Sequence, residues 1–130
     1  MNNIAKIENG VMYASKYSTF GVNPIPDVGT GGTLVLDINS FDVHLFDNEL
    51  TSDIDITFIN PRISTTTIII KLDPTTVRNV TFNTPAYHIN TTGPTTKTYV
   101  LPNKVGRVMF QIFYDGIDYY VSENPFYSVV

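Results

Sequence analysis

Few residues of this chain are suited to acid–base or nucleophilic chemistry. It has two histidines, His44 and His88, and no cysteine, which excludes a thiolate nucleophile, a thiolate metal site and a disulfide scaffold. His44 lies between Val43 and Leu45 on the polar phase of an apparent strand, which is typical of an exposed or edge histidine rather than a general base. His88 has no carboxylate near it in the sequence, and there is no Gly-x-Ser-x-Gly motif. The sequence therefore predicts no catalytic residues and no enzymatic activity.

Four carboxylates fall within one short stretch, at Asp47, Glu49, Asp53 and Asp55. Calcium requires several oxygen ligands from such a loop, but the stretch lacks the glycine-containing spacing of an EF-hand. Asp53 and Asp55 also alternate with apolar residues, as the solvent face of a strand does. We expect an ordinary acidic face, with a cation site as the alternative, and neither a bound metal nor a cofactor.

The charge distribution limits the possible partners. The net charge is −4, and the eight lysines and arginines are spread singly along the chain. Because no basic cluster can displace counterions from nucleic acid, no nucleic-acid partner is expected. No apolar run approaches the roughly 18 residues of a membrane-spanning helix, and the N-terminus lacks the basic and apolar regions of a secretory signal. No membrane partner is expected either.

Aromatic side chains offer a possible platform for sugars. The candidates are Tyr87, Tyr119, Tyr120, Phe126 and Tyr127, in a chain without tryptophan. If Tyr119 and Tyr120 lie on one strand, they point to opposite faces, so one of the two rings lies inward. Packing in the core or at an interface is the expected role of these rings, and a host-surface glycan is the alternative partner.

The elements that position these residues are strands. The chain has 130 residues, 42% of them apolar and 15% charged, which suits one domain with a real core. Threonine, isoleucine, valine, tyrosine and phenylalanine dominate, and these residue types favour strands over helices. Alternating apolar residues and turn signals predict eight strands, over residues 33–38, 41–45, 54–58, 65–72, 77–82, 97–101, 105–114 and 117–122.

Eight short strands joined by short turns predict an all-β fold, an antiparallel β-sandwich of jelly-roll type. Asp115-Gly116 predicts a two-residue hairpin turn, and Thr84–Thr96 is the longest expected loop. The apolar phase of each strand predicts the core: Leu34, Leu36, Phe41, Val43, Ile54, Ile56, Phe58, Ile68, Ile70, Phe82, Val108, Phe110 and Ile112.

The N-terminal segment, residues 1–32, differs from the β-sandwich domain expected over 33–130. Pro24 and Pro26 hold its backbone extended, and a glycine-rich stretch, 29–32, joins it to the domain. It carries several large apolar residues, among them Tyr13, Tyr17 and Phe20. Two interpretations follow: an edge strand folded onto the same domain, or an extended arm that packs on a neighbouring subunit.

The order of motifs resembles a small β-domain found in structural proteins of tailed bacteriophages. The matching pieces are a Thr-Leu-Val-Leu-Asp strand ending at Asp37, a Thr-Phe-Ile-Asn-Pro corner ending at Pro61, a strand ending at Asp73, and a closing Tyr-Asp-Gly-Ile-Asp-Tyr-Tyr hairpin at 114–120. The match covers roughly residues 33–121 and departs from the family pattern over 84–96, where relatives usually carry tryptophan and a glycine-rich stretch.

The resemblance implies a non-enzymatic virion component, made in the bacterial host cytoplasm. A capsid decoration or head-fibre protein attached through its N-terminal arm is expected, with other virion proteins as partners. The alternative is a tail-fibre tip or a module that recognises a host-surface receptor or glycan. In such a binding tip, the 84–96 loop is expected to be exposed and to build a concave site.

Self-association is expected as well. The strand over 105–114 is apolar on both faces, so some of its outer side chains are covered by another subunit, are covered by the N-terminal arm, or form an exposed patch. The resemblance favours a homotrimer, because phage fibres and many capsid decorations are three-fold. The residues expected at an oligomer or virion interface are Tyr13, Tyr17, Phe20, Met109, Phe113, Phe126 and Tyr127.

Overall fold

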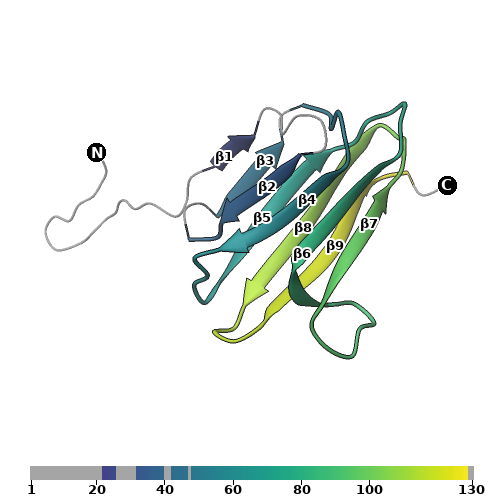
Figure 1. The fold of residues 1–130 in the computed structure, drawn as a ribbon. Coiled ribbons are helices and arrows are strands. Elements are labelled where there is room, and N and C mark those ends of the chain that lie inside the picture. Colours follow the sequence, from purple (N-terminus) through teal and green to yellow (C-terminus); the bar gives the residue numbers. More distant parts are fainter. Residues whose placement is uncertain (1–21, 26–31, 40–41, 47, 129–130) are drawn as a thin grey trace, which may run out of the picture.

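A computed structural model describes residues 22–25, 32–39, 42–46 and 48–128 of the chain, and of 22–25 the backbone alone. The described part is all-β, as predicted, and contains no helix. Figure 1 shows its strands, which are β1 (Val22–Ile25), β2 (Thr33–Asp37), β3 (Val43–Phe46), β4 (Ile54–Ile59), β5 (Ser64–Lys71), β6 (Arg78–His88), β7 (Thr95–Leu101), β8 (Gly106–Tyr114) and β9 (Tyr119–Tyr127).

The strands form one mixed sheet, which curls into a half-barrel around the core (Figure 1). The strand order is β1-β3-β5-β8-β9-β6-β4-β2, with β7 beside β6. The antiparallel pairing predicted from the sequence is wrong for several neighbouring strands. Five pairs are parallel: β1 with β3, β2 with β4, β3 with β5, β4 with β6, and β6 with β9. From β2 to β6 the chain alternates between the two arms of the sheet, so strands two apart in sequence become parallel neighbours.

The core lies on the concave side of this sheet and follows the predicted alternation on most strands. Ten of the predicted core residues are buried: Leu36, Ile54, Ile56, Phe58, Ile68, Ile70, Phe82, Val108, Phe110 and Ile112. Leu34 is only partly buried against this cluster, and Phe41 lies outside the described residues. Phe82 is fully buried at its centre, with the rings of Phe58 and Phe110 at centroid distances of 5.8 and 5.0 Å.

The phase predicted for β3 is wrong. His44 is 1% exposed and Phe46 is 1% exposed, whereas Val43 and Leu45 are half-buried on the opposite face. On a four-residue strand with apolar residues on both phases, the larger Phe46 ring is buried. His44 lies on the same face of β3 as Phe46 and is therefore buried too. The prediction that His44 is an exposed or edge histidine is wrong.

The long loop predicted over 84–96 is also wrong in its extent. Strand β6 continues through Pro85 to His88, and β7 begins at Thr95, so the connection spans only 89–94. The pairing of β6 with β7 is irregular between Phe82 and Ala86. Pro85 lies within this irregularity, where the missing N–H of a proline is tolerated in a strand.

The two ends of the described chain add strand rather than loop. The backbone of Val22–Ile25 pairs with β3 at an edge of the sheet, while residues 1–21 lie outside the described part. Strand β9 extends past the predicted end at Ser122 to Tyr127, and its last residues pair with the beginning of β8. The apolar tail 124–127 therefore docks on its own domain.

The β8–β9 hairpin is confirmed, but its turn is longer than predicted. The strands end and begin at Tyr114 and Tyr119, which leaves a four-residue loop closed by a hydrogen bond from the Asp115 N–H to the Asp118 carbonyl (3.1 Å). Gly116 has φ +103°, whereas Asp115 is not in the positive-φ region. The Asp115 carboxylate accepts the N–H groups of Ile117 and Asp118, which makes the wider loop stable without a second positive-φ residue.

Candidate functional site

The outward faces of four strands bring three aromatic side chains into one row. The register pairs Thr65 of β5 with Phe113 of β8, Phe113 with Tyr120 of β9, and Tyr120 with Tyr87 of β6. Directly paired residues in a sheet project from the same face, so these side chains stand next to one another. We call the side chains of Phe113, Tyr120 and Tyr87 the aromatic row. Thr65 lies next to Phe113, at the end of this row.

The rings of the row form a continuous ladder. Tyr87 and Tyr120 are stacked, with a centroid distance of 5.1 Å and an interplanar angle of 12°. Phe113 lies 6.0 Å from Tyr120 on the other side. The Tyr120 hydroxyl donates to the Asp115 carboxylate (2.8 Å), which fixes the central ring. Phe113 and Tyr120 are nevertheless 42% and 39% exposed, so the row is a surface feature rather than core.

A groove of about 420 Å³ runs beside this row. The next outward residues along the strands are Gln111 and Ser122, which the register pairs with each other. The groove is lined by Thr65, Tyr87, His88, Ile89, Gln111, Phe113, Tyr120, Val121 and Ser122. None of these lining residues is an acid, a lysine or an arginine, so the described wall of the groove combines aromatic surface with neutral hydrogen-bonding groups.

His88 lies behind the groove and is held in a neutral state. It is 5% exposed, and its Nδ1 lies 2.7 Å from the Tyr99 hydroxyl. Burial lowers the pKa of His88 below its usual value, and the positive charge of Lys97 lowers it further. Burial raises the pKa of Tyr99 to about 12. At neutral pH this buried pair therefore adds no charge to the groove.

The residues predicted for an interface lie in several different places. Phe113 belongs to the aromatic row, and Met109 is half-buried on the same face of β8. Phe126 lies near the end of β9, paired with Arg107, and is 60% exposed. Tyr127 packs against the core. The predicted interface residues of the N-terminal segment, Tyr13, Tyr17 and Phe20, lie outside the described residues.

Of the candidate sugar platforms, only Tyr87 and Tyr120 are brought together on the surface. Tyr119 is 8% exposed, which confirms that one ring of the Tyr119-Tyr120 pair lies inward. Gln111 and Thr65 also line the groove, and neither is among the residues predicted from the sequence. Their alternation with Ile112 and Thr66 marks them as outward-facing, but the pairing of β5 with β8, which places them beside the row, is not encoded in any local pattern.

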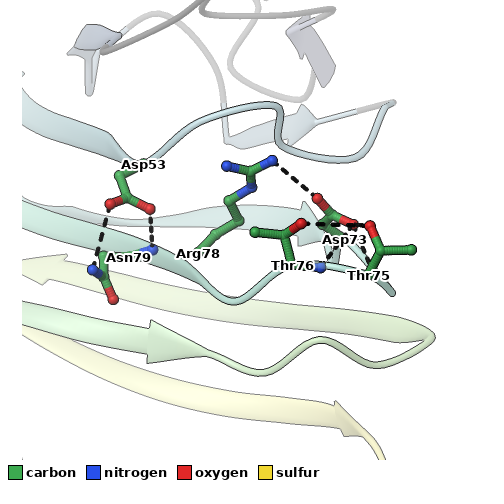
Figure 2. Close-up of polar contacts among 6 residues, drawn as sticks. All are labelled: Asp53, Asp73, Thr75, Thr76, Arg78 and Asn79. Carbon is green, nitrogen blue, oxygen red and sulfur yellow. Dashed lines mark hydrogen bonds and ion pairs between the residues drawn. The ribbon is translucent and has the colours of Figure 1, made fainter.

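A second polar cluster lies at the end of β5 (Figure 2). One carboxylate oxygen of Asp73, Oδ1, accepts the N–H groups of Thr75 and Thr76 and the Thr75 hydroxyl, at 2.8, 3.2 and 2.8 Å. The Arg78 guanidinium reaches Oδ2 at 3.1 Å. These hydrogen bonds, the one from the Thr75 N–H foremost, hold the pKa of Asp73 below its usual value. The carboxylate thus closes the turn between β5 and β6.

In the acidic stretch 47–55, Asp53 also stabilises the fold through hydrogen bonds. Its carboxylate accepts the Asn79 N–H at 2.8 Å and the Asn79 amide at 3.4 Å, as Figure 2 shows. Asp55 and Glu49 are exposed, and Asp47 lies outside the described residues. Within the described ranges, no group of three or more histidines, aspartates and glutamates is placed to hold a metal ion.

A third carboxylate, Asp37, joins two corners of the fold. It ends β2, and its side chain accepts the Asn39 N–H at 2.9 Å and the Asn60 amide at 3.1 Å. Asn60 follows β4 and has φ +53°, a conformation that asparagine tolerates better than most residues. Two segments 23 residues apart are thereby fixed to each other.

Comparisons with known proteins give no relative for this chain: no family model, curated protein or solved structure matches it. In the described part of the chain, no helix is long and apolar enough to cross a membrane.

Proposed function

We propose that the chain is a non-enzymatic structural component of a tailed-phage virion, a capsid decoration or head-fibre protein attached through its N-terminal segment. The proposal rests on the ordered motifs that resemble the phage β-domain. The proposal includes a jelly-roll-like sandwich as the fold. Its support is that both arms of the curled sheet contribute residues to one core.

The observation that carries this proposal is the use of the polar residues in those motifs. Asp37 and Asn60 bond to each other across two corners, Asp73 closes the β5–β6 turn, and Asp115 closes the β8–β9 loop. Every one of these side chains stabilises a turn of the scaffold. The motifs behind the resemblance therefore specify a shape, which is what a structural role requires, rather than a reactive centre.

The residues with acid–base potential support the same conclusion. His44 and His88 are 1% and 5% exposed, and burial is the main cause that lowers the pKa of each. His88 is adjacent to Tyr99 rather than to a carboxylate, and Asp73 and Asp115 are engaged by backbone N–H groups. Both imidazoles are buried and both of these carboxylates hold turns, which supports a structural rather than a catalytic role.

Self-association as a homotrimer is part of the proposal, with other virion proteins as further partners. Its support is the outer face at the beginning of β8, where Val105 just before the strand is 85% exposed and Met109 is half-buried. Contiguous apolar side chains on an outer face are typical of a surface that another protein covers.

A tail-fibre tip or a glycan-recognising module is the second candidate function. The aromatic row and its neutral groove favour it, because the Tyr87 end of the groove comes from the 84–96 segment that was expected to build a concave site. The two candidates place the chain at different positions on the virion.

Mass spectrometry of gradient-purified virions of the phage that encodes the chain tests the proposed function. We expect the chain in a fixed molar ratio to the major capsid protein, and its loss in a phage that lacks the gene. A chain found only in the lysate, and never with particles, would overturn the structural role. A copy number of a few per particle would instead favour the tail-tip candidate.

A further inference from the structure

We infer that the groove beside the aromatic row binds a neutral carbohydrate, with one sugar ring lying against Phe113 above Thr65. This inference rests on the second candidate function and deepens it by naming the ligand class and the residues that contact the ligand. It is carried by the order of the side chains across the sheet and by the chemistry of the groove lining.

Among the described residues, the order across the sheet places no ring beyond the Phe113 end of the aromatic row. Tyr120 has a ring on each side, Tyr87 at 5.1 Å and Phe113 at 6.0 Å, so it cannot offer a free face. Phe113 has a ring on the Tyr120 side and Thr65 on the other. Because threonine is small and Thr65 is exposed, the space over it can hold a flat ring that continues the ladder.

The polar groups of the groove lie where the hydroxyls of such a ring would point. Gln111 and Ser122 form the adjacent cross-strand pair, and Gln111 is exposed. A glutamine amide both donates and accepts, and serine and threonine hydroxyls do the same, which matches the paired donor and acceptor character of a sugar hydroxyl. An apolar ring face with convergent neutral polar groups is the chemistry of a sugar site.

The groove disfavours charged ligands. Its lining has no lysine or arginine to pair an anion and no carboxylate to pair a cation. The carboxylate of Asp115, which accepts the hydroxyl of the lining residue Tyr120, also accepts two backbone N–H groups. The groove volume, about 420 Å³, lies in the usual range of ~300–1,000 Å³ for small-ligand sites. A neutral saccharide of one or two rings is therefore the ligand class that fits.

The first experiment is a glycan array probed with the labelled full-length chain, followed by saturation-transfer NMR with the best neutral saccharide on the array. We expect binding to at least one neutral glycan. Phe113→Ala is expected to weaken the affinity about tenfold or more, the equivalent of one lost ring contact. Gln111→Ala is expected to weaken it several-fold.

Thr65→Phe provides a second variant that keeps the row intact. The added ring fills the proposed sugar position, so binding is expected to be lost while the melting temperature stays close to that of the unmodified chain. Phe126→Ala is the matched control, because it removes an exposed aromatic ring from the same strand as Tyr120 but outside the groove. Its affinity for the saccharide is expected to be unchanged.

Three results would overturn the inference. The first is the absence of binding to every neutral glycan on the array. The second is binding that survives both Phe113→Ala and Thr65→Phe. The third is an oligomer that Thr65→Phe disperses in sedimentation, which would make the groove an interface between copies of the chain.

Discussion

Gly116 has the backbone conformation least compatible with a side chain in the β8–β9 loop. Its φ is +103°, and an added Cβ would lie 3.3 Å from Cδ1 of Ile63. Gly116→Val should therefore destabilise the chain by about 1–3 kcal/mol, as urea denaturation can measure. Gly93→Val is the matched control, because a Cβ there meets nothing within 4 Å. Equal stability of both variants would show that the loop is not built as described.

The two buried histidines make stability depend on pH. The pKa values of His44 and His88 are lowered from 6.5, chiefly by burial, so the unfolded chain takes up protons first as the pH falls. Their contribution is fully present above pH 6.5 and is lost as the pH falls toward the folded-state pKa values. The free energy of unfolding in urea should decrease from pH 7.5 to pH 5.

His44→Phe isolates the share of one histidine in this pH dependence. Asp37 raises the pKa of His44 but less than burial lowers it, so removal of His44 should flatten the slope between pH 7.5 and 5. A slope identical to that of the unmodified chain would contradict the buried, neutral state assigned to His44.

At the scale of elements, the corner after β4 depends on one asparagine. Asn60 combines φ +53° with a hydrogen bond to Asp37 at 3.1 Å. Asn60→Ala loses the bond and places alanine, which tolerates the left-handed region less well than asparagine, at this corner; this should cost about 1–2 kcal/mol in thermal or urea unfolding. Asn60→Gly loses only the bond and should cost less. The reverse order would exclude backbone strain as the reason for asparagine at this corner.

The extension of β9 is tested by its removal. Deletion of residues 124–130 removes the ladder with the start of β8 and the partly buried Tyr127, which packs on the core. The melting temperature should fall clearly, with a loss of roughly 2 kcal/mol or more for Tyr127 and its neighbours. A tail that serves only a partner would leave the melting temperature unchanged.

Elements were predictable from the sequence where the alternation is long and one-sided. Ile54, Ile56 and Phe58 alternate with polar residues, and β4 has the predicted bounds to within one residue. On β3 both phases are apolar and the strand has four residues, so local pattern could not decide that His44 lies inward. Pro85 indicated a loop, since proline weakens a regular strand. The irregular pairing that tolerates it depends on the neighbouring strand β7 and cannot be read from the local sequence.

The candidate site was less predictable than the strands. Tyr87 and Tyr120 were identifiable as aromatic candidates, but their stacking depends on a parallel pairing of β6 with β9 that involves only two residue pairs. That pairing joins segments more than thirty residues apart and leaves no mark in either one. Gln111 and Thr65 gain a role only once this register is known.

At the scale of the whole molecule, the exposed apolar residues predict self-association. Sedimentation of the full-length chain at micromolar concentration should give a trimer, and a variant lacking residues 1–30 should dissociate more readily if that segment reaches a neighbouring subunit. A monomeric full-length chain would contradict self-association and leave assembly on the virion as the way to cover Val105.

The measurement that tests the central claim most directly is electron microscopy of purified virions labelled with a gold-conjugated antibody against this chain. A structural capsid decoration or head-fibre protein predicts gold distributed over the capsid of most particles, and none on particles of a phage that lacks the gene. Gold confined to the distal end of the tail would contradict the capsid placement and favour the receptor-binding candidate. Unlabelled virions, from a lysate in which the antibody detects the chain, would contradict the claim that this β-domain is part of the particle.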